Sequence, residues 1–355
     1  MPAQRLRDID FIKGIAIVLI VLGHDTQINL AGGWLQPAIY RFHVHIFLLL
    51  PFVFPMKNKR VGYLLDRAVR YFAPHLALML FASVLYSFMT GRSLSTFLID
   101  LILALVIGSE DFIKLATGFS LYWFMPCLVS MTLLRLLNQF QSRVVILVCA
   151  VALLFAGLIP REYLVYSPQG IIRAMYLYLM GVAIGWLTTH RPSPACFAGA
   201  LGGFACTGYV LYSHDTLVNI SEVYVPTVLD GPDFPLSISH PIFAFMTLFW
   251  GAPYLNKTLP FMHAGASWIG RQSLIIYLFH SLVLQAIFLV LAKFLGIISP
   301  EDTNALVKGV VLVGAVLLPV PIGWAIKRLP RLDSLVFPRT RAGWSLAWSG
   351  KKRGI

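Results

Sequence analysis

Charged side chains are scarce in this chain. Asp, Glu, Lys and Arg make up 12% of its 355 residues and hydrophobic residues 58%, whereas soluble domains average roughly 25% charged residues. Mean hydropathy is correspondingly high, at +0.78. This composition excludes a soluble globular protein, and the apolar runs leave no room for a separate soluble domain. We predict an integral membrane domain over residues 1–330 and a basic cytoplasmic tail over residues 331–355.

Cysteine is also rare, and no C-x-x-C motif occurs. The four cysteines, Cys127, Cys149, Cys196 and Cys206, all stand inside apolar runs. A disulfide framework is therefore excluded, and we interpret these residues as small members of the core. His43 and His45 form an H-x-H pair, but residues two apart on a helix point in different directions. We therefore expect no metal site.

The apolar runs are long enough for repeated membrane crossings. A helix needs roughly 20 residues to cross about 30 Å of hydrocarbon. That rule predicts a polytopic all-α bundle of about 10 transmembrane helices, near residues 9–28, 36–55, 72–90, 119–137, 144–159, 170–188, 196–212, 237–255, 273–295 and 305–326. The run at 97–108 is shorter and carries Asp100. We interpret it as an interfacial or re-entrant segment.

The net charge of +13 would point to nucleic acid in a soluble protein. In a membrane protein it has a simpler explanation, because Lys and Arg collect on cytoplasmic loops. Most basic residues fall on one side when both the N-terminus and the C-terminus are placed in the cytoplasm. We therefore predict this orientation and expect no nucleic-acid partner.

The first apolar segment is "FIKGIAIVLIVLGHDTQ". It carries two ionisable residues, Lys13 and His24, whose charged forms are energetically costly inside a membrane. Ionisable groups inside membrane spans usually serve a function. Eleven residues of helix separate the two by about 16 Å, close to three whole turns, so they share a face at different depths. Both can line one channel. Otherwise Lys13 is a snorkelling anchor and His24 bonds to a neighbouring helix.

Further basic residues flank the next two spans. Arg41 and His43 enter the second span on the side where the first span ends, so His24 can meet them. Arg67 and Arg70 form an R-x-x-R pair on one helical face at the start of the third span. Paired guanidinium groups at the cytoplasmic surface suit phosphate. Positive-inside topology also explains basic residues there, although it does not require this spacing.

Six motifs in a fixed order complete the pattern: "RLRDIDFIKGIAIVLIVLGH" at 5–24, "FHVHIF" at 42–47, "RAVRYFAPHL" at 67–76, "LYWFMPCL" at 121–128, "LYLMGVAIG" at 177–185 and "WIGRQSLIIYLFHSLV" at 268–283. In this order the chain resembles the bacterial acyltransferase type 3 family. Members of that family are integral membrane enzymes that move acyl groups, commonly acetyl, from cytoplasmic acyl-coenzyme A to cell-surface carbohydrates.

The resemblance assigns roles to particular residues. It implies that His24 is the essential residue and the general base for an acceptor hydroxyl, and that Lys13, Arg67 and Arg70 help to hold the donor. Residues matching other family motifs are expected to support the site or lie on its acceptor side: Arg41, His43, Trp123, Tyr277 and His280. Val44-His45 and Leu50-Pro51 depart from the family pattern, which affects the expected helix geometry there.

The resemblance also predicts ligands and location. It implies acetyl-CoA or another acyl-CoA as co-substrate, no tightly bound cofactor and a carbohydrate acceptor. Membrane lipids and glycan-assembly proteins are the further expected partners, in a multi-pass protein of the bacterial inner membrane. Two other functions remain open: a transporter or flippase for a glycan or lipid, and a catalytically inactive relative with a sensor or assembly role.

Overall fold

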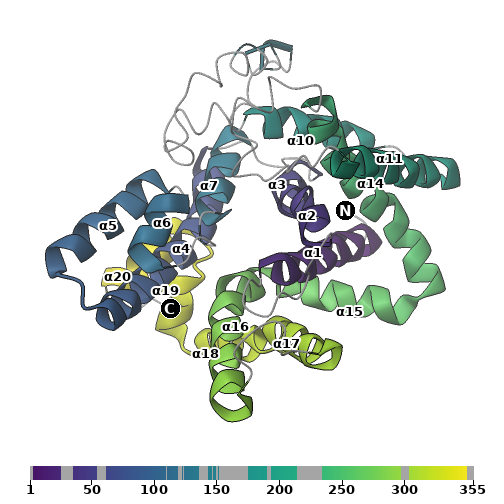
Figure 1. Ribbon diagram of the computed structural model, residues 1–355. Helices are drawn as coiled ribbons and strands as arrows, with labels where there is room; N and C mark the ends of the chain where they lie inside the picture. The colour runs from purple at the N-terminus through teal and green to yellow at the C-terminus, as the bar shows by residue number, and fades with distance from the viewer. Residues whose placement is uncertain are drawn as a thin grey trace. The chain divides into compact units, whose positions relative to one another are not determined.

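The computed structural model of the chain is entirely helical in its regular structure (Figure 1). It describes residues 3–24, 35–53, 61–108, 110–118, 122, 124–135, 143–145, 147, 148, 151, 175–189, 193–213, 234–296 and 304–349. No strand occurs in these ranges. The predicted all-α fold class is confirmed.

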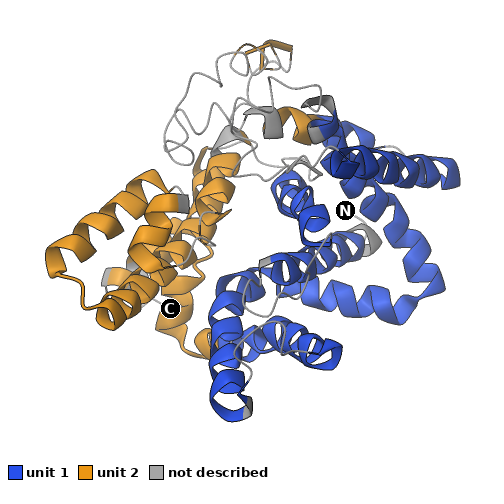
Figure 2. Cartoon of the chain, viewed as in Figure 1, with its two compact units in different colours: residues 1–53, 183–223, 230–324 blue, residues 54–182, 224–229, 325–355 orange. Residues whose placement is uncertain are grey.

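The helices group into two compact units, each built from separated stretches of chain (Figure 2). Unit 1 comprises Met1–Val53, Ala183–Val223 and Asp230–Trp324. Unit 2 comprises Phe54–Val182, Tyr224–Leu229 and Ala325–Ile355. The predicted boundary at residue 330 between a membrane domain and a tail stays a prediction.

Within the described ranges, four segments are long and apolar enough to cross a membrane. They are α4 (Val61–Thr90), α11 (Pro194–Ser213), residues Ser273–Phe294 of α16 (Ser273–Leu295), and Ala305–Arg328, which contains α17 (Ala305–Leu317) and α18 (Pro319–Arg328). Each overlaps a span that hydropathy predicts. The chain is therefore a membrane protein, while the predicted number of ten spans and the cytoplasmic termini stay predictions.

Several predicted spans take a different form or are only partly described. The span at 36–55 is two helices, α2 (Leu35–Tyr40) and α3 (His43–Val53), because the chain turns at Arg41 and Phe42. The predicted span at 9–28 corresponds to α1 (Ala3–His24). The first half of this helix holds several charged residues. Most of the predicted span at 144–159 lies outside the described residues.

The core of unit 1 is α1, which packs against α3, α14 (Phe234–Thr258), α15 (Pro260–Arg271) and α16. Its apolar side chains Ile12, Ile17 and Ile20 are fully buried. Gly14 and Gly270 lie at the crossing with α15, and a Cβ atom on either would overlap a backbone carbonyl of the other helix. The two backbones are therefore in direct contact, which only glycine permits.

Unit 2 is built around α4, with α5 (Leu94–Ile107), α6 (Glu110–Thr117) and α7 (Phe124–Leu134) packed against it. Two helices from the C-terminal segment, α19 (Pro330–Val336) and α20 (Arg341–Ser349), also contact α4. Asp66 of α4 accepts hydrogen bonds from the backbone N–H (3.0 Å) and Nε (3.1 Å) of Arg341. The basic C-terminal segment is thus folded and docked on α4.

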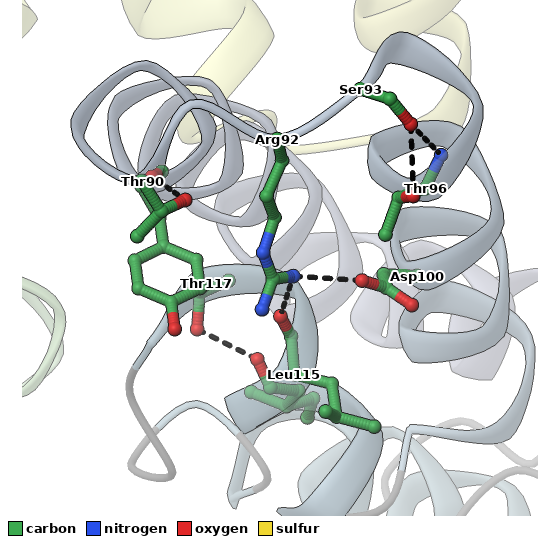
Figure 3. Close-up of polar contacts among 9 residues, drawn as sticks. Thr90, Arg92, Ser93, Thr96, Asp100, Leu115 and Thr117 are labelled. Atoms are coloured by element: carbon green, nitrogen blue, oxygen red, sulfur yellow. Dashed lines mark hydrogen bonds and ion pairs between the residues drawn. The ribbon is translucent and has the colours of Figure 1, made fainter.

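The turn between α4 and α5 is held by Arg92 (Figure 3). Its guanidinium pairs with Asp100 at 2.7 Å, donates to the Leu115 carbonyl and lies 4.6 Å above the ring of Tyr86. The charge of Asp100 is thereby compensated inside an otherwise apolar helix. At 14 residues, α5 is about 21 Å long, which is shorter than the hydrocarbon core.

Candidate functional site

Lys13 and His24 both belong to α1, which runs without a break from Ala3 to His24. The continuous helix keeps their predicted separation of about 16 Å. Lys13 is partly exposed, and its ammonium pairs with Asp10 one turn earlier at 2.6 Å. His24 is the last residue of the helix, and its side chain lies outside the described structure. The pairing of Lys13 with Asp10 was not foreseen from hydropathy.

Arg41 and His43 are brought together at the turn between α2 and α3. Both side chains are buried, with exposures of 2% and 1%. Arg41 lies 5.7 Å from the centre of the Tyr212 ring, so α11 contributes to this region. His43 Nδ1 donates to the Ile39 carbonyl at 2.7 Å and its ring meets Tyr40 edge-on. Burying an arginine and a histidine together requires polar or aromatic partners of this kind.

A third residue of this region, His240, was not among the predicted site residues. It comes from α14, stacks on Phe204 at 4.7 Å and meets Phe42 edge-on. The Thr207 hydroxyl donates to the Gly203 carbonyl at 2.7 Å, so His240 Nδ1 is the donor in its 2.8 Å bond to Thr207. The proton of the His240 ring is therefore on Nδ1, and Nε2 is left as an acceptor.

His45 extends the same cluster. It is completely buried, and neither ring nitrogen has a hydrogen-bond partner within the described part of the chain. Buried polar groups are nearly always hydrogen-bonded, so such a residue marks a site of interest. We name Arg41, His43, His45 and His240 the buried histidine cluster. The only sequence signal for His240 was an ionisable residue near the start of a predicted span.

Tyr277 and His280 share one face of α16, a helix that packs against α1. His280 is fully buried, and Nδ1 donates to the carbonyls of Tyr277 (2.7 Å) and Ile276 (3.1 Å). These bonds fix the tautomer with the proton on Nδ1. Lys13, His24, Arg41, His43, Tyr277 and His280 therefore all belong to unit 1.

Arg67 and Arg70 belong to unit 2, at the beginning of α4. Arg67 lies 5.7 Å from the centre of the Tyr63 ring. Arg70 is exposed, and its Nε donates to the carbonyl of Arg339 at 3.0 Å. The C-terminal segment thus contacts one arginine of the pair. Trp123, the remaining predicted site residue, lies outside the described residues.

Metal ligands do not gather in the described part of the chain. No group of three or more His, Cys, Asp or Glu side chains there is placed to hold an ion. The three histidines of the buried histidine cluster form no such group. The arrangement of the cluster is suited to polar contacts and proton transfer, because a neutral imidazole both donates and accepts.

Comparison with known proteins finds a match over most of the chain. A sequence model described as "Acyltransferase domain" matches residues 6–328. The nodulation protein NolL of Sinorhizobium fredii is 33% identical over 167 residues, covering 42% of this chain and 42% of NolL. That alignment spans less than half the length of the relative. No solved structure matches this chain.

Proposed function

This chain belongs to the acyltransferase type 3 family, and we propose that it is a membrane O-acyltransferase. The group transferred is acetyl or another acyl, the donor is cytoplasmic acyl-CoA, and the acceptor is a hydroxyl of a cell-surface or lipid-linked glycan. The proposal places the protein in the bacterial inner membrane as a multi-pass enzyme. The observation that carries it is the family match, which runs from the charged start of α1 to the end of α18.

His24 takes the central chemical role in this proposal. A sugar hydroxyl is a weak nucleophile near neutral pH, and imidazole is a suitable base because its unperturbed pKa lies near 6.5. His24 accepts the hydroxyl proton as the oxygen attacks the thioester carbonyl. The C–S bond then breaks, and the proton passes to the departing thiolate to give free CoA. A route through an acyl-histidine balances equally well and has the same net products.

The other residues have supporting roles in the proposal. Arg67 and Arg70 bind donor phosphates through their planar forks of N–H groups, and Lys13 assists from the charged half of α1. Arg41, His43, Tyr277 and His280 shape the acceptor side, with Trp123 expected to join them. The additional cluster members His45 and His240 extend this polar region.

Thioester cleavage by purified protein tests the proposed activity directly. A solution of acetyl-CoA and detergent-solubilised membrane lipid-glycan extract is expected to release free CoA, detected as a thiol, in proportion to added protein. A transporter or an inactive relative leaves the donor intact. Absence of protein-dependent thiol release with acetyl-, propionyl- and longer acyl-CoA donors contradicts the proposal.

Changes at Arg67 are expected to affect donor binding. Arg67→Gln removes a charge-assisted contact with a phosphate, so the KM for acyl-CoA is expected to rise about tenfold with a smaller effect on kcat. Arg67→Lys keeps the charge but loses the fork, and an intermediate KM is expected. The measurement is thiol release against donor concentration. Arg331→Gln, an exposed arginine of α19, is the control, and an equal KM rise there contradicts a specific role.

A further inference from the structure

A polar cleft of about 310 Å³ occurs in unit 1 where α1, α14 and α15 meet. The residues that line it come from all three helices: Arg7, Asn256, His263, Ala264, Ser267 and Arg271. None of these has a role in the proposed acyl transfer. Its volume is at the lower end of the range for small-ligand pockets.

Two of the lining residues are held by contacts across the crossing of α1 and α15. His263 is buried and stacks on Phe11, with ring centres 5.0 Å apart and planes 9° from parallel. Its Nε2 donates to the Asp8 carboxylate at 3.1 Å. Ser267 is buried as well, and its hydroxyl donates to the Arg7 carbonyl at 3.1 Å. These contacts fix the two helices against each other beside the cleft.

The charges around the cleft favour an anion. Arg7 and Arg271 have exposed side chains, and no carboxylate in the described part of the chain pairs with either. The nearby acidic residues of α1 are already engaged, Asp8 with His263 and Asp10 with Lys13. Neither of those carboxylates lines the cleft. Two guanidinium groups therefore line it with their charge uncompensated by a protein carboxylate.

We propose that this cleft binds a phosphate ester. A terminal phosphate has three acceptor oxygens, enough to receive the forks of Arg7 and Arg271 together with the side-chain amide of Asn256. A carboxylate has only two oxygens and cannot satisfy all three groups equally. All the residues that line the cleft belong to unit 1, and Arg67 and Arg70 are not among them. The site does not depend on the proposed transfer reaction.

Two sources can supply this chemistry to a membrane protein. One is a phospholipid headgroup, because α1 begins in the segment that charge bias assigns to the cytoplasmic membrane surface. The other is a nucleotide phosphate, such as those of coenzyme A. The two are distinguished by presenting each to the same delipidated protein.

The test uses purified full-length protein in neutral detergent. Coenzyme A and short-chain phosphatidic acid, each of which carries a terminal phosphate, are titrated separately, and each affinity is measured by calorimetry for the wild type and for Arg7→Gln/Arg271→Gln. The double variant is expected to bind one of the two ligands at least about tenfold more weakly, since charge-assisted hydrogen bonds are lost. Loss for coenzyme A identifies a nucleotide site, and loss for phosphatidic acid identifies a headgroup site.

The matched control is Arg328→Gln/Arg331→Gln, which removes the same charge from exposed positions outside the cleft. It is expected to keep wild-type affinities. Asn256→Asp retains both arginines, adds a repelling charge and is expected to weaken the same ligand. Wild-type protein that binds neither ligand, an unaffected Arg7→Gln/Arg271→Gln variant, or an equal loss in the control overturns the proposal. His24→Ala is expected to bind both ligands normally, so failure of the transfer reaction does not affect this result.

Discussion

His24→Ala is expected to lower kcat for acyl transfer by at least about 100-fold, which is the usual contribution of a general base. The variant removes the imidazole that, in the proposal, accepts the hydroxyl proton as the thioester is attacked. Donor binding is expected to change little, because Lys13 and the arginine pair are unaltered. Turnover is measured as acyl transfer in membranes that contain equal amounts of each variant.

Asp25→Asn is the matched control for this experiment. Asp25 lies outside the described residues, but in the predicted span at 9–28 it follows His24 directly, and successive helical residues point about 100° apart. The aspartate is therefore not expected to orient the imidazole, and Asp25→Asn is expected to retain most of the activity. Near-normal turnover of His24→Ala would contradict the assignment of His24 as the general base. A loss in Asp25→Asn as large as that in His24→Ala also contradicts it, because the effect is then not specific to the imidazole.

Gly270→Val is expected to prevent correct folding. A Cβ at this position overlaps the carbonyl of Asp10, and a Cβ at Gly14 overlaps the carbonyl of Ala266. These are backbone atoms, so neither helix can yield by changing a side-chain rotamer. The crossing of α1 and α15 must open, which we expect to cost more than about 4 kcal/mol, a size seen for severe overpacking or strain.

The same helix supplies a control for that variant. Gly265 of α15 has open space around its Cβ position. Gly265→Ala is therefore expected to be neutral or to stabilise the protein by up to about 1 kcal/mol through helix propensity. Both variants are compared in detergent by size-exclusion chromatography and thermal unfolding. A monodisperse Gly270→Val protein with the wild-type melting temperature contradicts the described contact.

Hydropathy was sufficient to locate the long helices of the fold. Each of α4, α11 and α16 contains an apolar stretch of about a membrane thickness, and length with composition is what the span rule uses. It could not resolve the break at Arg41 and Phe42. A turn there is stabilised by burying Arg41 beside Tyr212 of α11, and contacts between distant segments leave no trace in a local window.

The most important element missed by sequence reasoning is α15. Its 12 residues are too few for a span, so the span rule predicts no helix between residues 255 and 273. Pro260 at its first turn and the small residues through Gly270 were the available signals. Its partner Gly14 stands beside Lys13, but one glycine in an apolar run does not reveal which helix crosses there.

Sequence motifs identified only part of the candidate site, because contacts between distant helices do not show in a motif. Motif resemblance identified Arg41, His43 and His280, all of which are buried in unit 1. It did not identify His240, whose place beside Phe42 depends on how α14 packs. The pairs formed by Lys13 with Asp10 and by Arg92 with Asp100 were also missed, because ionisable residues were assessed singly and not by partner.

Sealed membrane vesicles give the most direct test of the central claim. Vesicles containing the protein and its native glycans are supplied on the cytoplasmic face with acetyl-CoA labelled in the acetyl group, and the glycan fraction is then isolated. We expect label in base-labile ester linkage to glycan, formed in step with free CoA, and lost in His24→Ala vesicles. Labelled glycan that forms equally in His24→Ala vesicles, or intact donor with no labelled glycan, would contradict the central claim.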